Sequence, residues 1–197
     1  MKVYISGQIS GIDPVEARAR FADAEDLLQG LGFDTVNPWD NGLPVDAPWI
    51  NHLCRDLEML NECNCIYMMD GWRESRGACI EYDFAIRTGK SVLFESSIIR
   101  CQGIVLRVTS AIHEVTGLKL SDYSASGRKM DGFFARMMFA HHCRLDGMTF
   151  GDIGRFINRE RTSVIRTLND YGNEFKYNAF FRGMAERVDE ILRRECQ

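Results

Sequence analysis

The sequence predicts an α/β domain with a parallel sheet, followed by an all-α domain. Three observations predict this arrangement. In the first half, short apolar runs alternate with segments of helical periodicity, whereas the second half shows helical periodicity and no convincing strand. All four prolines lie in the first half. Residues 1–99 carry 8 Lys/Arg and 16 Asp/Glu, but residues 100–197 carry 16 and 12. Such a split indicates two modules with different partners.

The first half opens with a strand and a helix. Residues 3–6 form an apolar run that ends at Gly7, as expected of a buried strand. A helix should follow, because Asp13 can cap it and Pro14 suits its first turn. Gly32 can end this helix. The other strands are predicted at residues 33–36, 65–69 and 91–94, and the other helices at residues 49–62 and 76–88.

The order of these elements, βαβαβαβ, implies a flavodoxin-like or Rossmann-like parallel sheet of four to five strands with helices on both faces. Ligands bind such sheets beyond the carboxyl ends of the strands. Those ends correspond to residues 7–11, 37–46 and 70–75.

The second half should contain helices only, including a helix-turn-helix. They are predicted at residues 104–115, 129–142, 149–156, 161–171 and 178–193. We therefore predict domains at residues 1–98 and 103–197, with a boundary near residues 96–103.

Composition narrows the class of protein. The chain has 197 residues, and no apolar run reaches the roughly 20 residues that span a bilayer. The first residues have the pattern of a strand, so no signal peptide is expected. The seven cysteines lack Cys-x-x-Cys spacing, which favours free thiols and a cytoplasmic protein. No cofactor and no metal site are predicted.

Four side chains of the first half can converge on one cleft. Tyr4 lies on the first strand, Asp56 on the helix before the third strand, and Ser75 and Glu81 on the segment after it. Two carboxylates and a phenol suit glycosidic chemistry, in which one carboxylate attacks or stabilises the anomeric carbon. The alternatives are a surface ion pair of Asp56 with Arg55 or Arg73, a plain core role for Tyr4 and a plain helix cap at Ser75.

These residues resemble the nucleoside 2-deoxyribosyltransferase-like superfamily over the first 95 residues. Residues 2–7 read Lys-Val-Tyr-Ile-Ser-Gly, and the family pattern Glu-x-Gly-x-Ala-x-x-x-Gly-Lys-Pro is met by Glu81, Ala85, Gly89 and Lys90. The resemblance implies that Glu81 is a nucleophile toward C1′ of a sugar. It also implies that Asp56 contacts the sugar and the base, and that Tyr4 orients the nucleophile.

The departures from the family pattern bear on the substrate. Asp83 replaces a glycine and Ser91 a proline. Ser75 stands where free-nucleoside transferases have an aspartate and nucleoside 5′-monophosphate N-glycosidases have a phosphate-binding serine. The resemblance thus favours a phosphorylated substrate, with water or a second base as acceptor. The further predicted substrate-binding residues are Ser6, Gly7, Ser10, Asp70, Trp72 and Gly77.

The second half contains a different candidate site. The segment from Gly147 to Arg166 has the layout of a helix-turn-helix, whose second helix would meet the major groove of DNA. Residues 104–171 resemble the C-terminal DNA-binding domain of the DnaA replication initiator, through the run Asn158-Arg-Glu-Arg-Thr-Ser-Val-Ile-Arg166. Arg161 replaces the family histidine, so the family's DNA sequence specificity is not carried over. No Walker motif is present, so no ATPase is expected. The predicted DNA-binding residues are Arg128, Lys129, Arg159, Arg161, Thr162, Ser163 and Arg166.

The leading hypothesis is cleavage or transfer at the N-glycosidic bond of a (deoxy)nucleoside or its 5′-monophosphate, coupled to DNA binding. The alternative is a non-catalytic, nucleotide-sensing DNA-binding regulator. A third possibility is that the second half is a helical bundle used only for dimerisation. Family sites are often completed by a second subunit, so the resemblance also implies a homodimer. No membrane partner is expected.

Overall fold

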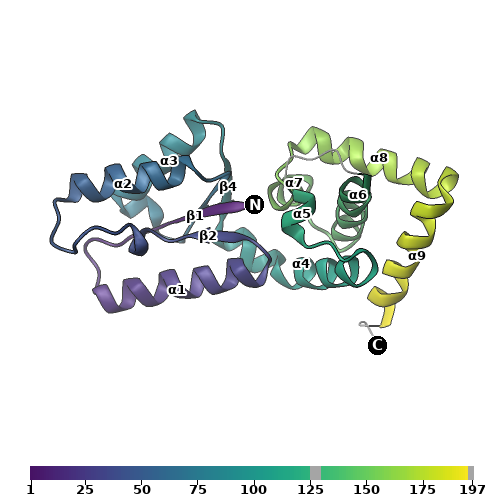
Figure 1. Cartoon of the computed structure of the whole chain (residues 1–197), viewed down its shortest axis with the longest axis horizontal. Coiled ribbons are helices and arrows are strands. Elements are labelled where there is room, and N and C mark those ends of the chain that lie inside the picture. Colours follow the sequence, from purple (N-terminus) through teal and green to yellow (C-terminus); the bar gives the residue numbers. More distant parts are fainter. Residues whose placement is uncertain (125–129, 195–197) are drawn as a thin grey trace. The chain divides into compact units, whose positions relative to one another are not determined.

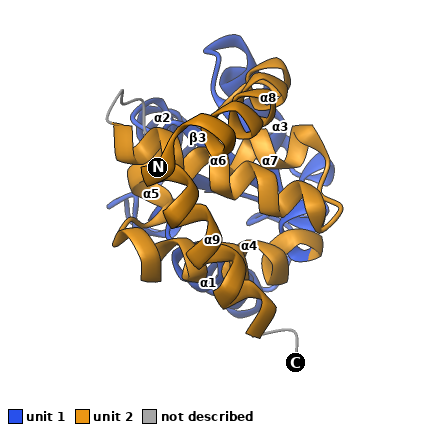
Figure 2. Ribbon diagram, turned by 90° about the vertical axis from the view of Figure 1, so that its right-hand side faces the viewer, with its two compact units in different colours: residues 1–99 blue, residues 100–197 orange. Residues whose placement is uncertain are grey.

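The computed structural model describes residues 1–124 and 130–194. The chain divides into two compact units, residues 1–99 and residues 100–197 (Figure 2). The predicted fold class is confirmed, since the first unit contains a parallel sheet flanked by helices and the described part of the second is helical.

The first unit is built on four parallel strands. They are β1 (Lys2–Ser6), β2 (Asp34–Val36), β3 (Cys65–Met68) and β4 (Ser91–Phe94), in the spatial order β2-β1-β3-β4. Helix α1 (Pro14–Gly30) covers one face of the sheet, and α2 (Trp49–Asn61) and α3 (Arg76–Arg87) cover the other (Figure 1). The central strands β1 and β3 are almost wholly buried, because both faces are covered.

The strand order places a switch point between β1 and β3. From β1 the chain crosses to β2 on one side, and later returns to β3 on the other. Loops that leave neighbouring strands in opposite directions open a crevice at the carboxyl edge of the sheet. Gly7 follows β1 there, and a Cβ on it would lie 2.8 Å from Met69 Sδ. The glycine therefore lets the two loops approach closely.

The Gly-Lys end of the family-like motif has a structural role. The Lys90 ammonium group donates to the carbonyl oxygens of Asn61 and Cys63, at 2.9 and 2.8 Å. These carbonyls belong to the C-terminal end of α2 and the turn after it, where backbone acceptors lack helical partners. Lys90 therefore ties the start of β4 to the end of α2.

The second unit contains short and long helices. Helix α4 (Glu95–Thr116) begins directly after β4, and α5 (Leu120–Ser124) follows it. The remaining helices are α6 (Met130–Leu145), α7 (Phe150–Phe156), α8 (Arg161–Tyr177) and α9 (Ala179–Arg194). The expected boundary at residues 96–103 is not a linker, because α4 passes through it without interruption. Residues 95–103 contain no proline and only one glycine, so nothing stops a helix there.

Helices α7 and α8 form the predicted helix-turn-helix layout. Thr149 caps α7 by accepting from the backbone N–H of Asp152. The turn depends on Gly154, since a Cβ at that position would collide with the carbonyl oxygen of Arg159. Asn158 adopts a left-handed conformation (φ 51°) in the same turn.

Candidate active site in the first unit

The two candidate carboxylates occupy core positions of their helices. On α3, Glu81 follows Ala78 by three residues and precedes Ala85 by four, and all three are buried. Asp56 lies between Leu53 and Leu60 on α2 with the same spacing. A helix that places a carboxylate on its apolar face loses stability through desolvation unless partners compensate. Both residues have such partners.

Glu81 receives one hydrogen bond on each carboxylate oxygen. Tyr4 Oη donates to Oε1 at 2.8 Å, and Ser6 Oγ donates to Oε2 at 2.5 Å. Tyr4 and Ser6 are two residues apart on β1, so their side chains project from the same face of the strand. Glu81 itself is only 6% exposed. The central strand therefore fixes the orientation of this carboxylate.

Burial raises the pKa of Glu81 to about 7, and the hydrogen bonds from Ser6 and Tyr4 oppose that rise. Burial and the neighbouring Glu81 carboxylate raise the pKa of Tyr4 well above its ordinary value. Tyr4 therefore stays protonated and remains a donor, while Glu81 can ionise near neutral pH. A carboxylate with these properties can serve as a nucleophile or a base.

Asp56 is the second carboxylate of the site, and it is 8% exposed. Asn41 Nδ2 donates to Asp56 Oδ1 at 3.1 Å and also lies 3.0 Å from His52 Nδ1. Burial raises the pKa of Asp56, and the Asn41 hydrogen bond opposes this effect. No ion pair of Asp56 with Arg55 or Arg73 is found in the described part of the chain, and Arg55 pairs instead with Glu58. The surface alternative for Asp56 is therefore wrong.

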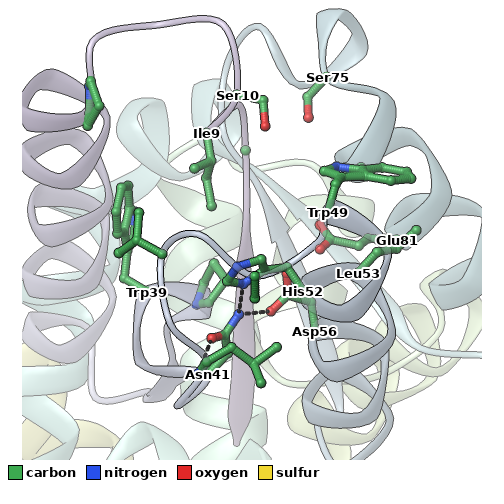
Figure 3. Close-up of a pocket in the computed structure, with 17 residues that line it drawn as sticks. Ile9, Ser10, Trp39, Asn41, Trp49, His52, Leu53, Asp56, Ser75 and Glu81 are labelled. Carbon is green, nitrogen blue, oxygen red and sulfur yellow. Dashed lines mark hydrogen bonds between the residues drawn. The ribbon is translucent and has the colours of Figure 1, made fainter.

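Both carboxylates line a cavity of about 340 Å³, which is within the size range of small-molecule sites. Figure 3 shows Ser10 and Ser75 at one end of this cavity and Asn41 at the other, with Glu81 between these ends. Trp39 and Trp49 flank it from opposite sides (Figure 3). The cavity thus has a hydroxyl-lined end at Ser10 and Ser75, a carboxylate in its middle and a second end at Asn41.

The structure brings most of the predicted substrate-binding residues into this cavity. Gly7, Ser10, Ser75 and Gly77 belong to its wall. Ser75 also caps α3, since its Oγ accepts from the Ala78 N–H at 3.3 Å. A hydroxyl that accepts this bond keeps its own hydrogen for a ligand, so the cap and a binding role are compatible.

Three of the predicted substrate-binding residues do not line the cavity, nor does the predicted catalytic residue Tyr4. Ser6 is buried behind Glu81, because strand alternation places it beside Tyr4. Trp72 packs in the core, 4.6 Å from the ring of Tyr82. Asp70 is exposed outside the cavity, and its backbone N–H donates to Glu95 at 2.6 Å. Gly71 between them has φ 82°, which turns the chain so that Trp72 enters the core.

Several cavity residues have no counterpart in the sequence-based prediction. Asn41, His52, Trp39 and Trp49 come from the segment after β2 and from the start of α2. The available signal was a proline-containing segment of residues 39–48 at the carboxyl end of a strand, where loops usually carry function. Its apolar members also line the cavity: Leu43, Val45 and Ala47.

The predicted DNA-binding residues gather at the start of α8. Arg161, Thr162, Ser163 and Arg166 are exposed, whereas Val164 between them is buried and anchors the helix. Arg159 lies in the turn before α8, is half-buried and donates to the carbonyl oxygen of Asn158 at 2.7 Å. Arg128 and Lys129 lie outside the described residues. The exposed group can face a nucleic acid from one helix end.

Comparison with known proteins matches the first unit to a family. Residues 1–94 match the model of a family described as a domain of unknown function, DUF4406. No curated protein matches the chain. Among solved structures the chain is similar to a 2-desoxiribosyltransferase from Leishmania mexicana, with a TM-score of 0.39 and 22% identity. That match covers 47% of this chain and 62% of the other, which is less than two thirds of the transferase.

The chain is also similar to a DNA replication initiation factor of known structure. The TM-score is 0.36 with 11% identity, and the match covers 97% of this chain and 87% of the other. No functional assignment rests on similarity at this level. Among the described helices, none is long and apolar enough to cross a membrane. Dimerisation stays a prediction.

Proposed function

We propose that the first unit cleaves or exchanges the N-glycosidic bond of a (deoxy)nucleoside or its 5′-monophosphate. The observation that supports this most directly is the buried Tyr4–Glu81–Ser6 cluster beside Asp56 at the wall of one cavity. Two carboxyl groups whose surroundings differ in this way can take different roles in one reaction. Glu81 is the nucleophile and Asp56 is the acid.

The reaction has two steps. A carboxylate oxygen of Glu81 bonds to C1′ of the sugar while the C1′–N bond breaks and its electron pair leaves with the base. A protonated Asp56 supplies the proton that the departing base takes up. Water or a second base then gives a proton to the Asp56 carboxylate and bonds to C1′, while the bond between C1′ and Glu81 breaks and its electron pair returns to the Glu81 carboxylate. Tyr4 and Ser6 hold the carboxylate in place throughout.

The cavity suggests how the substrate would lie. A base would lie toward the Asn41 end of the cavity, opposite Ser10 and Ser75, with Trp39 on one side of it, since aromatic rings stack on the faces of a base. The 5′ end would reach Ser10 and Ser75, beside the N-terminal end of α3. Hydroxyls and helix-opening amides bind phosphate well, so we propose that 5′-monophosphates are preferred over free nucleosides.

Release of free base tests this proposal. The purified protein is incubated with nucleosides and 5′-monophosphates, and the free base is quantified by chromatography. Replacing Glu81 by Ala or Gln should abolish release, because no other described carboxylate of the cavity has two buried donors. Asp83→Asn is the matched control, since Asp83 is exposed on the same helix and should be dispensable. Unchanged turnover in Glu81→Gln would refute the mechanism.

We further propose that the second unit binds double-stranded DNA through the start of α8. The exposed arginine and hydroxyl side chains there suit phosphate oxygens and base edges. The N-terminal end of the helix is also the end that helix-turn-helix proteins present to the major groove. If wild-type protein binds DNA but releases no base, the first unit is a nucleotide sensor, which is the alternative function.

Gel-shift titration at several salt concentrations tests the DNA proposal. Arg161→Ala and Arg166→Ala should each weaken binding and lower the salt dependence by about one phosphate contact. Arg187→Ala provides the control, because Arg187 is exposed on α9, away from the proposed face. If the α8 variants bind like the wild type, α8 is not the DNA-contacting helix.

A further inference from the structure

Asn41 has both of its side-chain N–H groups engaged, although it lies in the cavity wall. Its Oδ1 accepts from the Leu43 N–H at 3.0 Å. Its Nδ2 lies 3.1 Å from Asp56 Oδ1 and 3.0 Å from His52 Nδ1. An amide has two N–H donors, so one can serve each of these acceptors. Asn41 therefore has no N–H group left for a nucleobase.

Two backbone groups settle the direction of these bonds. The Leu43 N–H can only donate, which identifies the facing Asn41 atom as the oxygen and places Nδ2 toward Asp56 and His52. The Pro44 carbonyl oxygen can only accept, and it lies 3.1 Å from His52 Nε2. Nε2 therefore carries a hydrogen, and Nδ1 accepts from Asn41. His52 also has both ring nitrogens occupied.

The network joins Asp56 to the backbone of the segment that contains Leu43 and Pro44. Asn41 contacts Asp56 on one side, while its Oδ1 and the His52 ring contact the backbone of Leu43 and Pro44 on the other. Residues 43 to 47 contribute the apolar wall. Asp56 Oδ1 is engaged by Asn41, which leaves Oδ2 as the oxygen that can address a substrate.

We propose that Asn41 and His52 are positioning residues, which set Asp56 for proton transfer and hold residues 43–47 as the base-facing wall, and do not themselves read the base. This inference rests on the proposed function for its kinetic consequences. The hydrogen bond from Asn41 to His52 holds the Asn41 amide in the orientation that bonds Asp56, so its loss should lower kcat. The hydrogen bond between His52 and Pro44 holds residues 43–47 in place, so its loss should raise KM.

Two conservative variants separate these bonds. In His52→Asn the side-chain oxygen can take the place of Nδ1, which keeps the acceptor for Asn41 and loses the bond to Pro44. In His52→Gln the amide nitrogen can take the place of Nε2, with the opposite result. We expect His52→Gln to lower kcat about tenfold with little change in KM, and His52→Asn to raise KM about tenfold with kcat retained. Asn51→Ala, an exposed neighbour outside the cavity, should change neither.

Asn41→Leu tests the claim that Asn41 does not read the base. This variant should lower kcat for every accepted nucleotide by a similar factor. A change in the order of preference among bases would show that Asn41 reads the base, and would overturn the proposal. Equal kinetic effects of the two His52 variants would also overturn it.

A measurement without substrate keeps the inference separate from the proposed reaction. Nitrogen-15 NMR of the imidazole should show His52 with its hydrogen on Nε2. In Asn41→Leu the hydrogen should no longer be confined to Nε2. If wild-type protein releases no base but His52 has this tautomer, the reaction fails and the positioning network stands. If His52 carries its hydrogen on Nδ1, the network is wrong whatever the activity.

Discussion

The hydroxyl of Tyr4 donates to Glu81 Oε1 at 2.8 Å, across 77 positions of the sequence. Tyr4 is fully buried on the central strand β1, and Glu81 lies on the apolar face of α3. The sheet thus supplies a rigid donor for a carboxylate that burial would otherwise keep protonated. Tyr4 and Ser6 lie on the same strand, β1, which pairs with β3 in the centre of the sheet. The sheet therefore holds both donors in place, and the two hydrogen bonds orient Glu81.

The Tyr4 hydroxyl should control the pH at which the site becomes active. A nucleophilic Glu81 must be ionised, so kcat/KM should rise with pH through its pKa of about 7. Tyr4→Phe removes a hydrogen bond that lowers this pKa. A hydrogen bond to a charged group contributes about 1.5–3 kcal/mol, so the rise should move up by about one to two pH units. A pH–rate profile of both proteins measures the shift. A profile that stays in place would show that Glu81 ionisation does not limit the reaction.

Glu81 should also make the first unit less stable as pH rises. Its folded pKa of about 7 exceeds the ordinary 4.5, so the folded state holds the proton more tightly. The resulting stabilisation is fully present below about pH 4.5 and is lost as pH rises through about 7, a change of about 3 kcal/mol. Glu81→Gln cannot ionise and should lack this loss.

Tryptophan fluorescence can follow this change, because all three tryptophans lie in residues 1–99. Urea unfolding of wild type and Glu81→Gln at pH 4.5 and 7.5 gives the comparison. The stability difference between the two proteins should change between these pH values. A constant difference would contradict a raised pKa for Glu81.

The sequence allowed the fold and the central carboxylates to be predicted, because their signals are local. Helix spacing places Asp56 between Leu53 and Leu60, and strand alternation places Tyr4 on a buried strand. The same alternation places Ser6 beside Tyr4, although Ser6 is one of the predicted substrate-binding residues. Its partner Glu81 is 75 residues away, and no local pattern reveals that bond.

The Asn41 end of the cavity could not be predicted for a related reason. Asn41 and His52 are joined to Asp56 by side-chain geometry, and the segment between them has no periodicity. Trp72 is the opposite case: it was predicted to line the pocket, but the left-handed conformation of Gly71 directs it into the core. Loop side chains depend on backbone turns that composition does not determine.

Ser75→Asp should separate phosphorylated from free substrates. An aspartate can accept the Ala78 N–H as Ser75 does, so the cap of α3 is retained. Its negative charge would repel a 5′-phosphate at the hydroxyl-lined end of the cavity. We expect turnover of 5′-monophosphates to fall by about a hundredfold while free nucleosides are still accepted, as measured by base release from matched substrate pairs. Equal losses for both substrates would argue against a phosphate at Ser75.

Two glycines of the helix-turn-helix should respond in opposite directions to the same substitution. Gly154→Ala places a Cβ against the carbonyl oxygen of Arg159, a backbone atom that cannot move aside without displacing the turn before α8. We expect it to destabilise the second unit by about 3 kcal/mol and to weaken DNA binding. Gly172 is exposed within α8 with nothing near its missing Cβ, so Gly172→Ala should stabilise by about 1 kcal/mol and leave binding unchanged. Thermal unfolding followed by circular dichroism, with gel shifts on the same preparations, compares the two. Similar effects of both substitutions would show that the turn tolerates a side chain at Gly154 and that the close approach of the two helices does not depend on it.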